Sequence, residues 1–192
     1  MIRKIQTQKE IERAKRKKQV IIGGILILIM VVSTAGYAII SSIDGQKSKV
    51  EFNGVEFERS NGLWKFEIGG QEFYVQNLPQ SLKNVSVNGS FSVADYINKP
   101  LYIVGGSSSE VSELINFLGR YVLRYQEACL LEENCSKDVP VKDCTNNIVA
   151  FVQSNVTKVY KNESCVFIEG DFLKGVDAFI YRMLGVGDGS KK

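Results

Sequence analysis

The longest apolar run of the chain lies in its first quarter. No charged residue occurs from Gln19 to Ile43, and the stretch VIIGGILILIMVVSTAGYAIISSI would form a helix of about 36 Å at about 1.5 Å per residue. That length exceeds the roughly 30 Å hydrocarbon core of a bilayer. The pattern therefore predicts a transmembrane helix over residues 19–43 that contacts the lipid bilayer.

Short runs rich in aromatic and β-branched residues follow this apolar stretch. The turn pairs Asn53-Gly54, Asn61-Gly62 and Gly69-Gly70 separate them, which is typical of tight hairpins. We expect a β-meander within residues 44–78. Its strands are expected near 49–52, 55–60, 63–68 and 71–76. Its buried side chains are expected to be Phe52, Val55, Phe57, Trp64, Phe66, Ile68, Phe73 and Val75.

Residues 99–185 alternate apolar strand-like runs with helical periodicity. A nearly continuous run, LYIVGG at 101–106, predicts a strand that is covered on both faces. Further strands are expected at 148–152, 157–160 and 165–170, and a short helix is possible at 92–97. The fold class is α/β (mixed α+β): a transmembrane helix, a β-meander, then a mixed sheet with two amphipathic helices. A right-handed crossover predicts that strand 101–105 is parallel to one of the later strands.

The two amphipathic helices are expected at 107–129 and 171–184. In the first, Ser107 and Glu110 have the spacing of a capping box, and Glu113 falls on the polar side. Gly185 or Gly187 can end the second helix. The apolar stripes comprise Val111, Leu114, Ile115, Leu118, Val122, Tyr125 and Cys129 in the first helix, and Phe172, Val176, Phe179, Ile180, Met183 and Leu184 in the second.

Charge predicts the orientation of the apolar run. The first 19 residues carry a net charge of about +6, and positive flanks stay cytoplasmic. Residues 1–18 are therefore expected on the cytoplasmic side of the cell membrane, and residues 44–192 on its outer side. Since the whole chain carries +3, the outer part carries about −3. The basic balance thus indicates topology, and no nucleic-acid partner is expected.

Two other readings of the first residues compete with an uncleaved anchor. A cleavable signal peptide would have its site at Ser33-Thr34-Ala35 or Gly36-Tyr37-Ala38, but such peptides have a shorter apolar run. A pilin-type leader needs a small residue after the charges, whereas Gln19 follows Lys18. The length of the run favours the signal-anchor.

The turn from Gly105 to Ser109 joins a strand to a helix N-terminus. Backbone N–H groups and the helix dipole at such a turn can hold an anion. The five residues Gly105, Gly106, Ser107, Ser108 and Ser109 match neither the dinucleotide fingerprint nor the P-loop, which also needs a Lys. A glycine turn with a serine cap is the simpler interpretation.

Catalytic chemistry is restricted because the chain has no His. Ser-His-Asp and Cys-His systems and His-bearing zinc sites are excluded. A Ser-Lys pair or a carboxylate pair stays open, and Glu169 with Asp171 is the best-placed acidic cluster, although acidic residues there more often cap a helix. We expect no catalytic residue, no metal and no cofactor.

Four cysteines are spaced by gaps of five, eight and twenty residues. These gaps do not form the Cys-X₂-Cys pairs of zinc ribbons or thioredoxin-type sites. Outside the cytoplasm an even number of cysteines predicts disulfides, and four allow three pairings. Cys129–Cys135 and Cys144–Cys165 are favoured, because Cys129 is close in sequence to Cys135 and the other two each precede an apolar strand.

Five asparagines stand in Asn-X-Ser/Thr triplets, which accept N-linked glycans outside the cytoplasm. About one such triplet is expected by chance, and a polar domain rich in Asn and Ser turns is the alternative explanation. The excess predicts a glycoprotein. The candidate sites are Asn84, Asn88, Asn134, Asn155 and Asn162.

Several segments together resemble uncharacterised single-pass membrane proteins of archaeal type. They are FNGVEFERSNGLWKFEIGGQEFYV, KPLYIVGG, PVKDCTNNIVAF and CVFIEGDFLKGVDAFIYRMLGV, which cover most of the part after the apolar run. The resemblance lies in overall texture and implies no activity, catalytic residue or cofactor. It agrees with N-glycosylation outside a bilayer.

These observations favour a non-enzymatic protein of the cell envelope. The first hypothesis is a domain tethered to the outer face of the membrane that binds an envelope protein or a surface polymer. A small-ligand or anion receptor that uses the 105–109 turn is the alternative. A hydrolase built on carboxylates is the third possibility.

Overall fold

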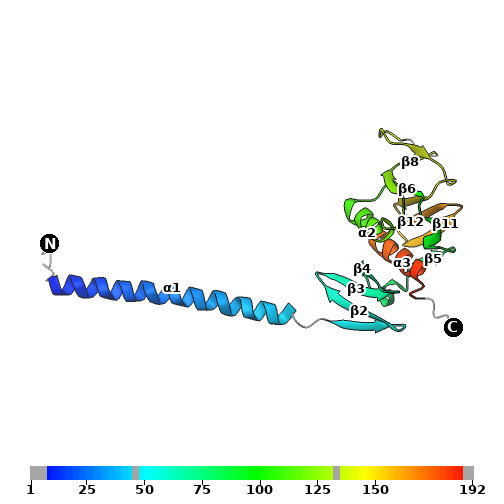
Figure 1. Cartoon of the computed structure of the whole chain (residues 1–192). Helices are drawn as coiled ribbons and strands as arrows, with labels where there is room; N and C mark the ends of the chain where they lie inside the picture. The colour runs from blue at the N-terminus through cyan, green and yellow to red at the C-terminus, as the bar shows by residue number, and fades with distance from the viewer. Residues whose placement is uncertain (1–7, 45–47, 132–134, 188–192) are drawn as a thin grey trace. The chain divides into compact units, whose positions relative to one another are not determined.

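A computed structural model describes residues 8–44, 48–131 and 135–187 (Figure 1), and the side chains of residues 8–14 and 34–44 lie outside that description. The chain divides into two compact units, Met1–Lys47 and Ser48–Lys192. The fold is mixed α+β, as predicted, with three α-helices and three sheets in the described residues.

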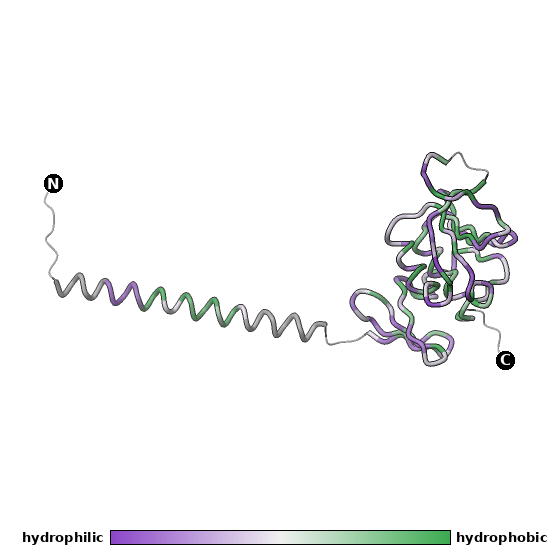
Figure 2. Tube along the Cα trace, turned by 45° about the horizontal axis from the view of Figure 1, so that its top comes forward, coloured by the Kyte–Doolittle hydropathy of each residue, from purple (hydrophilic) through white to green (hydrophobic). Residues whose placement is uncertain are grey.

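The first unit contains a single helix, α1 (Gln8–Asp44). In its described part, polar residues give way to a continuous apolar stretch (Figure 2). Within the residues that the structure describes, no helix is long and apolar enough to cross a membrane. Residues 34–43 of the transmembrane helix predicted over 19–43 lie outside the described side chains.

The predicted β-meander opens the second unit. It consists of β1 (Lys49–Phe52), β2 (Val55–Ser60), β3 (Leu63–Ile68) and β4 (Gln71–Val75), which pair antiparallel in chain order. Both residues of each predicted turn have positive φ, for example 50° at Asn53 and 79° at Gly54. That geometry is the type I′ turn, whose twist matches the flanking strands. Phe57, Phe66, Phe73 and Val75 are buried, and the other predicted core residues of the meander are partly buried against them.

The second sheet has six strands in the order β5-β11-β12-β10-β6-β7. Its centre is parallel, since β10 pairs in parallel with β6 and β12. The parallel pairing of β6 with β10 confirms that the strand predicted at 101–105 is parallel to a later strand. The strands are β5 (Ser86–Asn88), β6 (Pro100–Val104), β7 (Arg124–Glu127), β10 (Ile148–Val152), β11 (Lys158–Asn162) and β12 (Cys165–Glu169).

Two helices, α2 (Ser108–Leu118) and α3 (Phe172–Leu184), lie between the two sheets (Figure 1). On one side they pack on the six-stranded sheet through a shared core that includes Leu101, Val149 and Val166. On the other side the meander covers them, with Phe57 and Phe66 against Tyr181 and Phe73 against Phe117. Both helices are therefore covered on two sides.

The far face of the six-stranded sheet carries a smaller core. Tyr102, Ile148 and Cys165 belong to it, and the segment that contains the cysteines packs on them. That segment forms the two-stranded sheet of β8 (Cys129–Leu130) and β9 (Val141–Lys142). Short 3-10 turns occupy Pro79–Leu82 and Val93–Asp95, the latter inside the predicted 92–97 helix.

The helix predicted over 107–129 is wrong beyond residue 118. The structure ends α2 at Leu118, with Gly119 donating its N–H to the carbonyl of Ile115. The chain then turns and residues Arg124–Glu127 form β7 beside β6. The apolar spacing continues past Gly119, but the aromatic Tyr125 and the long polar side chains around it also suit an edge strand.

Gly175 allows α3 to approach the sheet closely. A Cβ at this position would lie 2.3 Å from Cγ2 of Ile168 on β12. We expect Gly175→Ala to destabilise the second unit by about 1–3 kcal/mol through overpacking, although alanine favours helices. Chemical denaturation of the two chains measures this difference. A gain in stability would show that helix propensity outweighs the close approach.

Candidate functional site

The most deeply buried charged residues form a pair between the two helices. Glu113 of α2 is 8% exposed and Asp177 of α3 is 0% exposed. The meander covers the side of α2 that the apolar periodicity marks as polar, so Glu113 was wrongly expected to face solvent. The two carboxyl groups are close enough to influence each other's pKa.

The chain immediately after β4 supplies the partners of both carboxyl groups. The backbone N–H and side-chain amide of Gln76 each donate to Glu113 at 3.2 Å. The backbone N–H and side-chain amide of Asn77 donate to Oδ2 of Asp177 at 2.7 and 2.8 Å. The Tyr181 hydroxyl completes the cluster by donating to the carbonyl of Asn77 at 2.7 Å. Two consecutive residues of one loop thus connect the meander to both helices.

One proton shared between the carboxyl groups explains how they can be buried together. Burial raises the pKa of Glu113 to about 9, and the neighbouring Asp177 raises it further. Burial also raises the pKa of Asp177, while hydrogen bonds from Glu113 and Asn77 oppose that rise. Oδ1 of Asp177 is buried and has no hydrogen-bond partner among the described residues. We infer that Glu113 holds the proton, because its pKa is raised to about 9 and two like charges cannot both ionise at such a site.

This arrangement joins three elements of the fold and is closed to a substrate. Asp177 is fully enclosed, so a substrate cannot reach its oxygens. A cavity of about 380 Å³ opens elsewhere, where Phe52, Leu82 and Tyr181 form part of its lining and neither carboxyl group does. The buried pair and its donors connect α2, α3 and the loop after β4. The stability that this connection gives depends on pH, because the pair holds a proton.

The turn at 105–109 is already occupied by an internal carboxylate. Glu110 accepts a hydrogen bond from the backbone N–H of Ser107 at 3.1 Å, as the capping box predicts, and another from the Ser109 hydroxyl at 3.0 Å. Burial opposes ionisation of Glu110, but these bonds keep its pKa below the ordinary value. A bound anion would meet this negative charge, so the geometry argues against an anion site.

The two glycines of this turn have a packing role. Gly105 and Gly106 have φ values of 71° and 80°. A Cβ at Gly106 would lie 2.8 Å from the Phe151 ring. Left-handed backbone and close approach to β10 both require glycine here.

The predicted acidic cluster at Glu169 and Asp171 serves structure as well. Asp171 caps α3 by accepting from the Lys174 N–H at 3.2 Å, and its other oxygen pairs with the Lys174 ammonium at 2.8 Å. Glu169 pairs with Lys158 on the neighbouring strand at 3.2 Å. The two carboxylates are engaged with different cations, so this cluster supplies no free acid and base.

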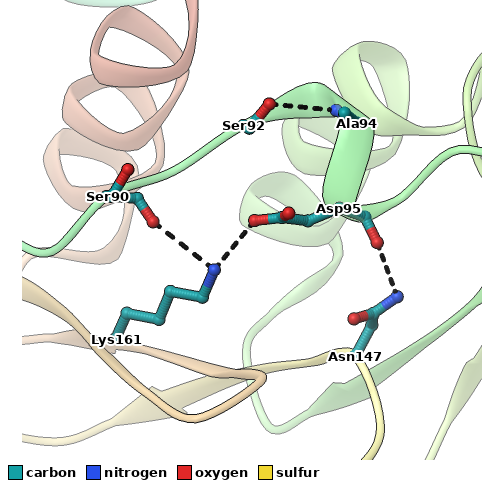
Figure 3. A network of polar contacts seen from close by, with 6 residues as sticks. All are labelled: Ser90, Ser92, Ala94, Asp95, Asn147 and Lys161. Atoms are coloured by element: carbon teal, nitrogen blue, oxygen red, sulfur yellow. Dashed lines mark hydrogen bonds and ion pairs between the residues drawn. The ribbon is translucent and has the colours of Figure 1, made fainter.

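A serine–lysine arrangement occurs at Lys161, but its geometry differs from that of a catalytic dyad. Figure 3 shows the Lys161 ammonium between Asp95, at 2.8 Å, and the backbone carbonyl of Ser90, at 3.4 Å. The same segment is held by Asn147, which donates to the carbonyl of Asp95 at 3.1 Å. A lysine base must be neutral and contact the serine hydroxyl. Lys161 instead contacts a carboxylate and a carbonyl, and so fastens residues 90–95 to the sheet.

Both disulfides are present with the pairing that the sequence favoured. Cys129 is bonded to Cys135 and Cys144 to Cys165, with Cα–Cα distances of 6.0 and 4.9 Å. Cys165 is fully buried in the core on the far face of the sheet. Among the described residues there is no free cysteine, and no group of three metal-ligating side chains occurs in that part of the chain.

Four of the five candidate glycosylation sites fall on described residues, and all four are exposed. Asn88 lies on the edge strand β5 with Asn84 shortly before it, Asn155 lies between β10 and β11, and Asn162 ends β11. Asn134 lies outside the described residues. These four positions gather on the β5–β11 side of the six-stranded sheet.

One signal in the sequence pointed to the carboxyl pair that the interpretation missed. Asp177 stands between Val176 and Ala178 in the apolar part of the second predicted helix. An acidic residue inside such a stripe needs a buried partner. The sequence could not identify that partner, since Gln76, Asn77 and Glu113 are distant along the chain.

Comparisons with protein-family models, curated proteins and solved structures found no match to this chain. The resemblance to archaeal single-pass membrane proteins stays a prediction. The interpretation of function therefore depends on the chain's own residues and contacts.

Proposed function

We propose that this chain is a single-pass membrane protein whose C-terminal unit is held outside the cell membrane and acts, without catalysis, by binding an envelope protein or a surface polymer. The observation that carries the proposal is the exposed apolar surface of α1. Between Val20 and Val32, eleven large apolar side chains of this helix are 52% to 73% exposed. Helices that are hydrophobic all round are found in membranes or in protein interiors.

The charge-free run from 19 to 43 and the basic residues before it support the anchor and its orientation. Lys15, Arg16, Lys17 and Lys18 precede the apolar side chains directly. A cluster of positive charge next to an apolar run orients the N-terminal segment toward the cytoplasm.

Two features of the C-terminal unit agree with an oxidising, extracytoplasmic location. Its four cysteines are all paired in disulfides, which persist outside the cytoplasm. The exposed sequons Asn84, Asn88, Asn155 and Asn162 are accessible to a glycosylating enzyme. The candidate acid and base groups described above all make contacts within the fold. This agrees with a binding role.

Proteolysis of intact cells tests the topology. We expect added protease to remove a tag at the C-terminus of the full chain and to spare a tag at the N-terminus until the membrane is opened. Protection of the C-terminal tag in intact cells would reject the proposed location.

Lysines in the middle of α1 test the anchor. The double change Ile29→Lys and Val32→Lys places two charges among its apolar side chains, at a cost of about 2.5–3.5 kcal/mol each for membrane insertion. We expect the full chain to move from the carbonate-resistant membrane fraction to the soluble or degraded fraction. The matched control, Ile29→Leu with Val32→Leu, should stay in the membrane. Equal retention of both variants would contradict the anchor.

A further inference from the structure

A cavity of about 340 Å³ opens on the far face of the six-stranded sheet, beside the segment that contains the cysteines. One of the predicted glycosylation sites, Asn162, forms part of its wall. We propose that an N-linked glycan on Asn162 folds back into this cavity and covers the disulfide between Cys144 and Cys165. Such a glycan requires the extracytoplasmic location proposed above, so this inference rests on the proposed function.

The register of the β11–β12 pair fixes the face on which the Asn162 side chain lies. Asn162 is paired with Cys165, and Tyr160 is paired with Phe167. Directly paired residues of neighbouring strands have their side chains on the same face of the sheet. The rings of Tyr160 and Phe167 accordingly stack, with centroids 5.1 Å apart. Cys165 is buried on the far face, so the exposed Asn162 side chain lies on that face too.

The lining of the cavity suits a neutral sugar. A pyranose ring has an apolar face of C–H groups and an edge of hydroxyl groups. Leu130, Leu131 and Phe167 supply apolar walls, and the carboxylates of Asp143 and Glu163 can accept hydrogen bonds from hydroxyl groups. No lysine or arginine occurs among the described lining residues, so an anionic ligand would be repelled. Ligand pockets start at about 300 Å³, so this volume admits about one or two sugar rings.

Covalent attachment favours the chain's own glycan over a sugar from solution. Glycosylation joins the amide nitrogen of Asn162 to C1 of the first sugar of a lipid-linked oligosaccharide. The bond between C1 and the lipid phosphate breaks, the phosphate leaves with its electron pair, and the amide proton passes to a base of the glycosylating enzyme. The first sugars are then held at the cavity at an effective concentration of about millimolar. Asn155 precedes the opposite end of β11, so its glycan lacks this proximity.

A glycan in the cavity also covers the more accessible end of the disulfide. Cys165 is fully buried, whereas Cys144 is partly exposed and forms part of the cavity wall. Reduction of a disulfide by thiol exchange requires a thiolate to reach one of its sulfur atoms. Docked sugar rings occupy the space next to Cys144, so they slow reduction of the bond.

Enzymatic release of the glycans from the native full chain tests the docking. A glycan that is docked about 90% of the time leaves about one tenth of the molecules open to a glycosidase, so its release slows about tenfold. We expect the Asn162 glycan to be released about tenfold more slowly than the Asn155 glycan, as measured by glycopeptide mapping over time. After denaturation the two rates should be similar. Equal rates in the native chain would overturn the proposal.

Two matched variants test the cavity wall. Leu131→Gln removes an apolar wall and spares the core, because Leu131 is 68% exposed. Val156→Gln is the control, since Val156 is 63% exposed, lies beside Asn155 and is the middle residue of that sequon. We expect release from Asn162 to become several-fold faster in Leu131→Gln and to stay unchanged in Val156→Gln. Equal rates at Asn162 in the two variants would reject the cavity as the docking site.

Substitutions of Ser164 test the protection of the disulfide. Ser164→Ala removes the sequon but keeps Asn162 and the backbone hydrogen bonds of residue 164 with Cys144 and Ile148. Ser164→Thr keeps the sequon. In a mild reductant we expect Cys144–Cys165 to open about tenfold faster in Ser164→Ala than in Ser164→Thr, as measured by alkylation of the freed thiols. The same rate in both variants would show that the glycan does not cover the bond, against the proposal.

Site occupancy separates failure of the docking from failure of the proposed location. An unmodified Asn162 beside a glycosylated Asn155 would overturn the docking and leave the location intact. Absence of glycan from all four described sequons, together with protection of the C-terminal tag from protease in intact cells, would reject both.

Discussion

The C-terminal unit is expected to unfold more easily as the pH rises from about 5 to about 9. Glu113 keeps its proton in the folded chain up to a pKa of about 9, against an ordinary value of 4.5 after unfolding. Between these values unfolding releases a proton, so stability is fully present below the lower value and is lost as the pH approaches the upper one. The slope reaches about 1.4 kcal/mol per pH unit for one proton.

Denaturation of the full chain in detergent at a series of pH values measures this slope. Glu113→Gln provides the decisive comparison, because its amide has the shape of the carboxylic acid and cannot ionise. We expect the variant to lose most of the slope and to be more stable than the original chain near pH 8. Glu67→Gln, at an exposed position of β3, removes one carboxylate elsewhere and should leave the slope unchanged.

A flat profile in the original chain would show that Glu113 and Asp177 do not share a buried proton. An unchanged slope in Glu113→Gln would assign the pH dependence to another group. Tyr181 lies in the same cluster, and burial together with Asp177 and Glu113 raises its pKa, so it stays neutral throughout this range.

Local sequence signals predicted the meander and most of the strands of the six-stranded sheet. The three turn pairs required positive φ at both positions, and only Asn and Gly adopt that geometry at low cost. The end of α3 at Gly185, where φ is 70°, has the same cause. Such features are predictable because they depend on the backbone preferences of residues that are adjacent in the sequence.

The parts that were not predicted depend on contacts between distant residues. Residues 124–127 continue the apolar spacing of α2, yet pairing with β6 makes them a strand. Glu113 lies on the polar side of α2, yet the meander covers that side. In both places a contact with a distant element, β6 or the meander, overrides the local pattern. The periodicity of one helix carries no information about that contact.

Burial on two sides also explains why the strongest polar cluster lies in the interior. The sides of α2 and α3 that face the two sheets are closed to water, so an acidic residue there needs donors from the protein. Gln76 and Asn77 solve this problem by supplying four N–H donors from one short loop. These hydrogen bonds fix the position of the meander relative to both helices. Apolar packing alone would specify that position less precisely.

Loss of the Cys144–Cys165 disulfide is expected to have the other large effect. It closes a loop of 21 residues and joins the end of the cysteine segment to the first residue of β12. The chain-entropy relation gives about 3 kcal/mol for such a loop and about 2 kcal/mol for the 6-residue loop between Cys129 and Cys135. Because Cys165 is fully buried while Cys135 lies nearer the surface, packing adds to the difference.

The two double variants, Cys144→Ala with Cys165→Ala and Cys129→Ala with Cys135→Ala, are matched controls for each other. Each removes one bond and leaves the other pair intact, so denaturation of the full chain compares the two loops directly. We expect the first variant to lose more stability and the second to retain a cooperative transition. Equal losses would mean that loop length and the burial of Cys165 do not decide the effect. A larger loss in the second variant would place the main constraint in the short loop that precedes β9, where the far face of the sheet is covered.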